Sequence, residues 1–182
     1  MKSYEIVSKI LKSFERYYSI KKKFDSSSSD AEKIENAVVA DDTVTEPFFA
    51  EAEFNSHTEQ YFLIKSAKIS ESDSSEHVFF YAAENLNADE LAKIESKSWE
   101  TGLSRVVPHF GHRNTDVTLV IVCDRIDDDA FRRIRKISHS KSYMLTFKGW
   151  SNFRVIALET SSKKIAYNRL GKDLKKTIEA VV

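Results

Sequence analysis

Two histidines stand three positions apart in a stretch with the composition of a loop. His109 and His112 are the only histidines at close spacing in the chain. Imidazoles at this spacing can face one metal ion, or they can exchange protons near neutral pH. A transition-metal site needs at least a third ligand, and only Asp116 or Asp124 could supply it, because no Cys or further His is near. We therefore predict a polar cluster and no metal site, and the cluster consists of His109, His112, Arg105 and Arg113.

Three glutamates suggest a different chemistry, the hydrolysis of a phosphodiester. The predicted order of elements, a helix, three strands, a helix and a strand, is also the core order of the PD-(D/E)XK nucleases. Those enzymes hold Mg²⁺ with an acid on the second core strand and an E-x-K motif on the third. Here no lysine follows Glu84 two positions later, so the motif is broken. A degenerate or divergent nuclease-like domain that acts on or binds nucleic acid is the alternative function, and its candidate acids are Glu51, Glu84 and Glu95.

Basic side chains are concentrated in the second half of the chain. Residues 1–100 hold 12 Lys and Arg against 20 Asp and Glu, whereas residues 101–182 hold 16 against 8. Such asymmetry can mark a surface for an anionic partner such as nucleic acid, but we favour two halves that interleave and mix their charges. Aromatic residues among the basic ones could stack on bases, although the solvated face of a helix explains the pattern equally well. The densest basic patch is Arg132, Arg133, Arg135, Lys136, Lys148 and Arg154.

The composition excludes several classes of protein. With only four glycines, the chain has no phosphate-binding loop of the P-loop or Rossmann kind, and no G-x-S-x-G nucleophile motif occurs. We predict no cofactor. Apolar runs stay far below the ~20 residues of a membrane span, and the N-terminus lacks the apolar core of a signal peptide. The single cysteine, Cys123, excludes an intrachain disulfide and fits a reducing cytoplasm.

The absence of a catalytic signature beside a strong globular pattern favours a binding role over an enzymatic one. We expect a cytoplasmic, non-enzymatic binding or regulatory domain. Its partner is expected to be another protein or a second copy of the chain, and no membrane partner is expected.

The spine of the fold is predicted by an apolar run at 115–123, which is typical of a strand buried on both faces. A helix at 128–138 and a strand at 153–158 follow it, so a strand–helix–strand unit is expected. Apolar residues at spacings of three and four predict two further helices, at 2–19 and 88–103.

The stretch between those two helices alternates between apolar and polar residues. This alternation predicts an antiparallel meander of strands at 48–54, 60–69 and 77–83. Polar residues at 55–59 and 71–75 have the composition of turns. The predicted fold class is therefore α+β, with a mixed sheet of about five to six strands covered by helices.

One domain is expected to include all of residues 1–182. A short strand at 165–167 and a final helix starting near Asp173 complete it. Within it, residues 25–45 contain four consecutive serines among acidic side chains, so we predict a flexible insertion there.

Several short stretches resemble an uncharacterised prokaryotic domain family found in anaerobic bacteria and archaea. They are Glu59–Lys65, Glu76–Phe80, Val117–Asp124 and the segment Lys148-Gly149-Trp150 with the Arg-bearing strand after it. The resemblance extends over about residues 46–172. It implies a compact domain and carries no activity to this chain, and the serine-rich segment departs from the family's pattern.

Overall fold

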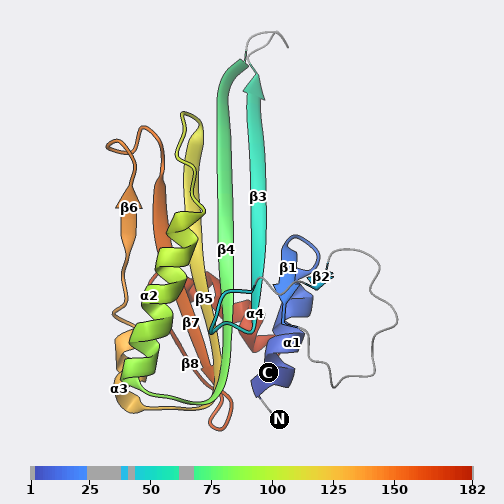
Figure 1. Ribbon diagram of the computed structural model, residues 1–182, viewed down its shortest axis with the longest axis vertical. Coiled ribbons are helices and arrows are strands. Elements are labelled where there is room, and N and C mark those ends of the chain that lie inside the picture. The colour runs from blue at the N-terminus through green and yellow to red at the C-terminus, as the bar shows by residue number, and fades with distance from the viewer. Residues whose placement is uncertain (1–2, 24–37, 41–43, 62–67, 182) are drawn as a thin grey trace.

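A mixed sheet forms the centre of the computed structural model, which describes residues 3–23, 38–40, 44–61 and 68–181. Eight strands in this part of the chain lie in the order β2-β1-β3-β4-β5-β7-β6, with β8 also paired to β7 (Figure 1). Their bounds are β1 Ser19–Lys22, β2 Val38–Ala40, β3 Ala50–Tyr61, β4 Lys68–Leu86, β5 His112–Ile126, β6 Ser140–Ser142, β7 Trp150–Glu159 and β8 Lys164–Tyr167.

The predicted α+β class with a mixed, helix-covered sheet is confirmed. Strands β3 and β4 pair antiparallel, whereas β4, β5 and β7 run parallel to one another. Parallel neighbours need crossover connections, and these contain α2 (Ala88–Ser104) between β4 and β5 and α3 (Asp128–Ile134) between β5 and β7. The spine expected from the sequence is therefore present.

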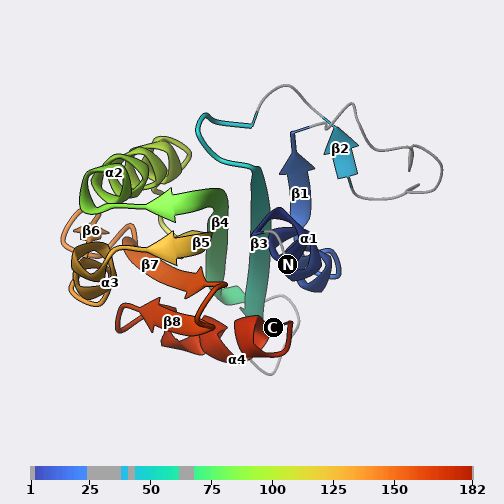
Figure 2. The ribbon, with the colours of Figure 1, turned by 90° about the horizontal axis from the view of Figure 1, so that it is seen from below.

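Helices cover both faces of the sheet (Figure 2). On one face, α1 (Ser3–Phe14) and α4 (Lys175–Glu179), which follows the 3-10 helix η1 (Gly171–Leu174), contribute to one apolar cluster. On the other face, α2 and α3 contribute to a second cluster. Strand β5 serves both, since Val120 and Val122 belong to the first cluster and Leu119 and Ile121 to the second. Burial on both faces explains why its sequence is continuously apolar.

The two turns predicted at 55–59 and 71–75 are wrong, because both stretches continue as strand. Residues of β3 and β4 pair from Ala50 opposite Phe80 to Tyr61 opposite Lys68, in a hairpin that projects beyond the rest of the sheet (Figure 1). Residues 55–57 and 72–75 are exposed or half-buried, so their side chains can be polar without ending the strand. The described residues of the predicted three-strand meander therefore form two long strands, and residues 62–67 of the strand predicted at 60–69 lie outside the described part.

The strands beyond the predicted five or six are short and lie toward the edges of the sheet. Strand β6 is exposed throughout, and β1 buries only Ile20, so neither has the apolar alternation that identifies a strand. Strand β2 falls within the segment 25–45 that we predicted to be an insertion. Of that segment, residues 25–37 and 41–43 lie outside the described part, and Val44 is buried in the core.

The two halves of the chain do not interleave within the sheet. Strands β1 to β4, from the acidic half, lie on one side of the β4–β5 boundary, and β5 to β8, from the basic half, lie on the other. The charge asymmetry of the sequence therefore becomes a polarity across the molecule instead of being mixed along the sheet.

Helix α2 packs against β5 so closely that one position accepts only glycine. A Cβ added to Gly102 would lie 2.5 Å from Cγ2 and 2.6 Å from Cγ1 of Val117, which is fully buried. The valine cannot turn away, because its β-branched side chain is fixed in a packed core.

We predict that Gly102→Ala lowers the free energy of unfolding by about 1–3 kcal/mol, because overpacking outweighs the gain in helix propensity. Urea denaturation of both proteins measures it. Lys97→Ala, an exposed change on the same helix, is the control and should have little effect. A Gly102→Ala protein as stable as the wild type would contradict the close packing of α2 on β5.

Candidate functional site

A polar cavity of about 350 Å³ lies where β3, β4 and β5 meet the loop that follows α2. Four of the five histidines in the sequence line it, namely His57, His77, His109 and His112. We call this cavity the histidine pocket. Arg105 also lines it, so three of the four residues predicted as a polar cluster come together there. The fourth, Arg113, is exposed and lies outside the lining.

Asp73 accepts hydrogen bonds from two of these histidines. His109 Nε2 lies 2.7 Å from Asp73 Oδ2, and His57 Nδ1 contacts Asp73 Oδ1. The other ring nitrogen of His109 lies 3.1 Å from the carbonyl oxygen of Val107. A carbonyl and a carboxylate only accept, so this geometry requires a proton on both ring nitrogens of His109. The Val107 carbonyl and Asp73 accordingly raise the pKa of His109, and the two histidines lower the pKa of Asp73.

His112 is buried, and both of its ring nitrogens have partners. Nδ1 donates to the carbonyl oxygen of Lys148 at 2.8 Å, and Nε2 lies 3.0 Å from the hydroxyl of Thr115. The carbonyl fixes the tautomer, so Thr115 donates to Nε2. The close approach requires Gly149, which has φ +81° and whose added Cβ would lie 2.6 Å from His112 Nδ1. The Lys-Gly-Trp turn singled out in the sequence therefore holds His112 in place.

Arg105 reaches the histidine pocket from the end of α2, and its charge is neutralised there. Its Nη2 donates to Glu51 Oε2 at 2.6 Å, and the Glu51 side chain is only 5% exposed. The backbone N–H of Thr45 donates to the other carboxylate oxygen at 2.8 Å. The guanidinium also lies over the ring of Phe79, 5.3 Å from its centroid. This ion pair joins β3 to the end of α2.

His77 has a buried ring nitrogen that makes no hydrogen bond within the described part of the chain. Its side chain is 5% exposed, and Nδ1 has no hydrogen-bond partner among the described residues. The carboxylate of Glu53 lies 4.0 Å from Nδ1, beyond hydrogen-bonding distance. Burial lowers the pKa of His77, so the ring is neutral at pH 7. A buried polar atom without a partner is unusual, and the residue that carries this one is part of the lining of the histidine pocket.

The three candidate acids of the nuclease alternative lie apart from one another. Glu51 pairs with Arg105, as described. Glu84 is exposed on β4, five residues beyond Phe79, the residue that lies opposite Glu51. Glu95, which the helical pattern places on the apolar face of α2, accepts from His139 Nε2 at 2.7 Å and Arg133 Nη2 at 3.2 Å. These contacts explain a buried carboxylate in that position.

The predicted basic patch does not form one surface. Arg132 and Arg133 pair with acids, Asp129 and Glu95. The ammonium group of Lys148 lies 5.3 Å from the ring centroid of Phe110, beside the histidine pocket. Arg135 lines a different cavity, Lys136 is exposed, and Arg154 is largely buried.

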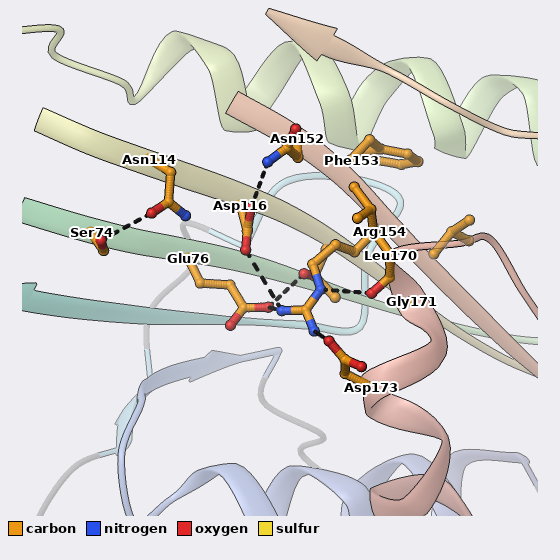
Figure 3. A network of polar contacts seen from close by, with 12 residues as sticks. Ser74, Glu76, Asn114, Asp116, Asn152, Phe153, Arg154, Leu170, Gly171 and Asp173 are labelled. Atoms are coloured by element: carbon orange, nitrogen blue, oxygen red, sulfur yellow. Dashed lines mark hydrogen bonds and ion pairs between the residues drawn. The ribbon is translucent and has the colours of Figure 1, made fainter. Parts of the chain in front are cut away.

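Arg154 is the centre of a second polar network, on the face of the sheet that α1 covers (Figure 3). Its Nη1 donates to Glu76 Oε1 at 3.1 Å and lies 3.8 Å from Asp116 Oδ2. Glu76 also accepts from Thr118 and from Tyr18, each at 2.6 Å. Three donors therefore satisfy a carboxylate that is 11% exposed.

The remaining contacts of this network extend it toward the end of the sheet. Asn152 donates to Asp116 at 3.4 Å, and Ser74 donates to Asn114 at 3.0 Å (Figure 3). Burial raises the pKa of Asp116, and Arg154 opposes that shift. Burial and the carboxylate of Glu76 likewise raise the pKa of Tyr18. Glu76 lies between the turn predicted at 71–75 and the strand predicted at 77–83, so no sequence pattern indicated its role in this network.

Two kinds of feature are absent from the described residues. In residues 3–23, 38–40, 44–61 and 68–181, no group of three or more His, Cys, Asp or Glu side chains is placed to hold a metal ion. None of the helices found there has the length and apolar character needed to cross a membrane.

We predict that NMR titration places the pKa of His109 above 6.5 and that of His77 below it. In Asp73→Asn the pKa of His109 should fall, whereas His77 should keep its value as an internal control. The interaction between Asp73 and His109 stabilises the fold fully above 3.8, the ordinary pKa of Asp73. This stabilisation is lost as the pH rises through the raised pKa of His109. Asp73→Asn should therefore lower stability most between about pH 4 and pH 6.5. If the pKa of His109 is the same in Asp73→Asn as in the wild type, the hydrogen bond between His109 and Asp73 is contradicted.

Removing Arg154 should be costly, because it leaves Glu76 buried without its cation. We predict that Arg154→Met lowers the free energy of unfolding by about 3 kcal/mol in urea denaturation at pH 7. Arg113→Met removes the same charge from an exposed position of β5 and serves as the control. Equal, small losses in both proteins would contradict a stabilising role for the network.

The comparisons with known proteins identify a family and no activity. No curated protein and no solved structure matches the chain. A family model described as a domain of unknown function (DUF8052) matches residues 2–180, and the chain therefore belongs to this family.

Proposed function

We propose that this chain is a non-enzymatic binding domain of the cytoplasm that self-associates through the loops beside the histidine pocket. One observation carries the proposal. Eight large apolar side chains are exposed in the described part of the chain, and six of them lie on two neighbouring loops or at the start of β7, which follows the second loop. These six are Val107, Phe110, Met144, Leu145, Phe147 and Trp150, and we call them the loop surface. Apolar side chains gathered in one place are typical of protein interfaces.

The backbone between β6 and β7 presents these side chains to solvent. Met144, Leu145 and Thr146 have φ of 47°, 50° and 76°, a left-handed conformation that is unfavourable for residues other than glycine. Hydrogen bonds from Phe147 N to Met144 O and from Lys148 N to Tyr143 O close the turn. Leu145 is 86% exposed as a result. A strained turn that exposes leucine and methionine supports a role in contact with another molecule.

A second copy of the chain is the partner that the charges favour. The net charge is zero, so two copies do not repel each other as strongly charged proteins do. Acidic and basic halves on opposite sides of the sheet also allow one copy to attract the other. The histidine pocket adjoins the loop surface, because Val107 belongs to both.

The occupied ring nitrogens of His109 and His112 support a binding role over catalysis. A general base needs an unshared nitrogen that faces its substrate, and both rings use both nitrogens within the chain. The nuclease-like alternative lacks comparable support, because Glu51, Glu84 and Glu95 do not converge. Burial of Cys123, which raises the pKa of its thiol to about 12, is compatible with the cytoplasm, and the prokaryotic origin suggested by the resemblance stays a prediction.

We predict that the wild-type protein sediments as a reversible dimer in analytical ultracentrifugation. A double variant that carries both Leu145→Asp and Phe147→Ser removes two apolar side chains of the loop surface. Its dissociation constant should be higher than that of the wild type by at least about tenfold, because the apolar contact buried in the dimer is lost. Both positions are exposed in the single chain, so the variant should fold normally.

Tyr17→Ser is the matched control, since Tyr17 is 63% exposed on the segment after α1 and lies outside the loop surface. It should dimerise like the wild type. A wild-type protein that remains monomeric up to about 1 mM would overturn self-association. Dimers that survive the double change would assign the contact to another surface.

A further inference from the structure

A second cavity, of about 430 Å³, lies beside β8, the C-terminal end of α3 and η1. Its lining is Arg135, Ile165, Tyr167, Asn168, Arg169 and Lys172, and we call it the basic cavity. We propose that the basic cavity binds a phosphorylated small molecule of about the size of a nucleotide. This site is separate from the proposed self-association surface, because β8 pairs with the C-terminal part of β7, whereas the loop surface lies at its N-terminal end.

The charges of the basic cavity are not neutralised by the described part of the protein. No acidic group there forms an ion pair with Arg135, Arg169 or Lys172, whereas Arg105 and Arg154 each pair with a buried glutamate. The neighbouring acid Asp173 lies 4.0 Å from Arg154. Three like charges around one cavity repel one another, and a bound dianion would remove that repulsion.

The frame of the cavity is rigid, because Asn168 is buried and fully hydrogen-bonded. Its Nδ2 donates to the carbonyl oxygens of Ile137 and Phe153 at 3.1 and 2.9 Å. Its Oδ1 accepts from the N–H groups of Gly171 and Val155 at 2.7 and 3.2 Å. Asn168 therefore ties together the end of α3, β7 and η1, and it positions the cations on either side without binding the ligand itself.

Two further features hold the cavity in a form suited to a ligand. The guanidinium of Arg135 lies 5.7 Å from the ring centroid of Phe131, a contact that restrains the side chain. A Cβ added to Gly171 would lie 2.2 Å from the carbonyl oxygen of Val155, so the start of η1 packs directly against β7. The backbone that carries Arg169 and Lys172 on either side of this glycine is thereby held against β7, and both side chains are exposed.

The chemistry of the lining identifies the class of ligand. One guanidinium group can donate two parallel hydrogen bonds to the oxygens of a phosphate, and an ammonium group adds a point charge. Ile165 and Tyr167 add an apolar wall, which suits an organic group attached to the phosphate. A volume of about 430 Å³ lies within the usual range for small-molecule sites. A nucleotide and a sugar phosphate share this chemistry, and free phosphate lacks the organic part.

The test is isothermal titration calorimetry of the full chain with AMP, glucose 6-phosphate, inorganic phosphate and adenosine. We expect at least one of the phosphate esters to bind, and inorganic phosphate and adenosine to bind at least about tenfold more weakly than that ester. Replacing Arg169 and Lys172 together by Ala should weaken binding of the phosphate ester by at least about tenfold, and the size of this loss should depend on the salt concentration. The preferred ester then distinguishes a nucleotide from a sugar phosphate.

Arg113→Ala with Lys97→Ala is the matched control, because it removes two exposed charges outside the cavity and should leave binding unchanged. If the double change in the cavity unfolds the protein, Arg169→Lys replaces it, which keeps the charge but loses the paired donors and should still weaken binding. Absence of binding by both esters at millimolar concentration would overturn the proposal. So would an equal loss in the control, or tight binding of single-stranded RNA that survives the cavity changes.

Discussion

The ion pair between Arg154 and Glu76 lies where the apolar core of the sheet gives way to polar side chains. Toward one end of β4, β5 and β7, both faces are apolar and covered by helices. Toward the other end the same three strands carry Glu76, Asp116 and Arg154 on one face and histidines on the other. The polar end can stay in the sheet because its largest charges compensate one another within the fold.

This compensation links the two faces of the sheet. Neighbouring residues of β4 point to opposite faces, so Glu76 belongs to the arginine network and His77 to the histidine pocket. Any shift in the register of β4 would exchange the two and bury the wrong groups on each side. The pocket and the network therefore depend on one pairing of strands, in which Glu76 lies opposite Asp116 and His77 opposite Val117.

The spacing of apolar residues in the sequence predicted the buried parts of the fold. It failed in exposed strands, where residues facing solvent need not be apolar. The apolar run of β5 and the helical spacing of α2 identified both elements, because burial on both faces or on one stripe constrains residue type. The polar ribbon of β3 and β4 was divided by false turns, since exposed strands place no such demand on sequence. In the site, the spacing of His109 and His112 indicated the loop, whereas His57 and Asp73 join it only through strand pairing at a distance of many residues.

The projecting hairpin gives the domain two levels of local stability. The pairing of β1 with β3 ends at Glu53, and the pairing of β5 with β4 ends at Asp73, which lies opposite His57. Beyond His57 and Asp73, β3 and β4 therefore pair only with each other in the described part, and this length of the hairpin is held by its own ladder alone. Amide hydrogens there should exchange with solvent through local opening, long before the core unfolds. His57 and Asp73 form the pair at the base of this less stable region, and His112 is anchored in the core. The histidine pocket thus adjoins the boundary between two cooperative units, and a bound partner would couple them into one.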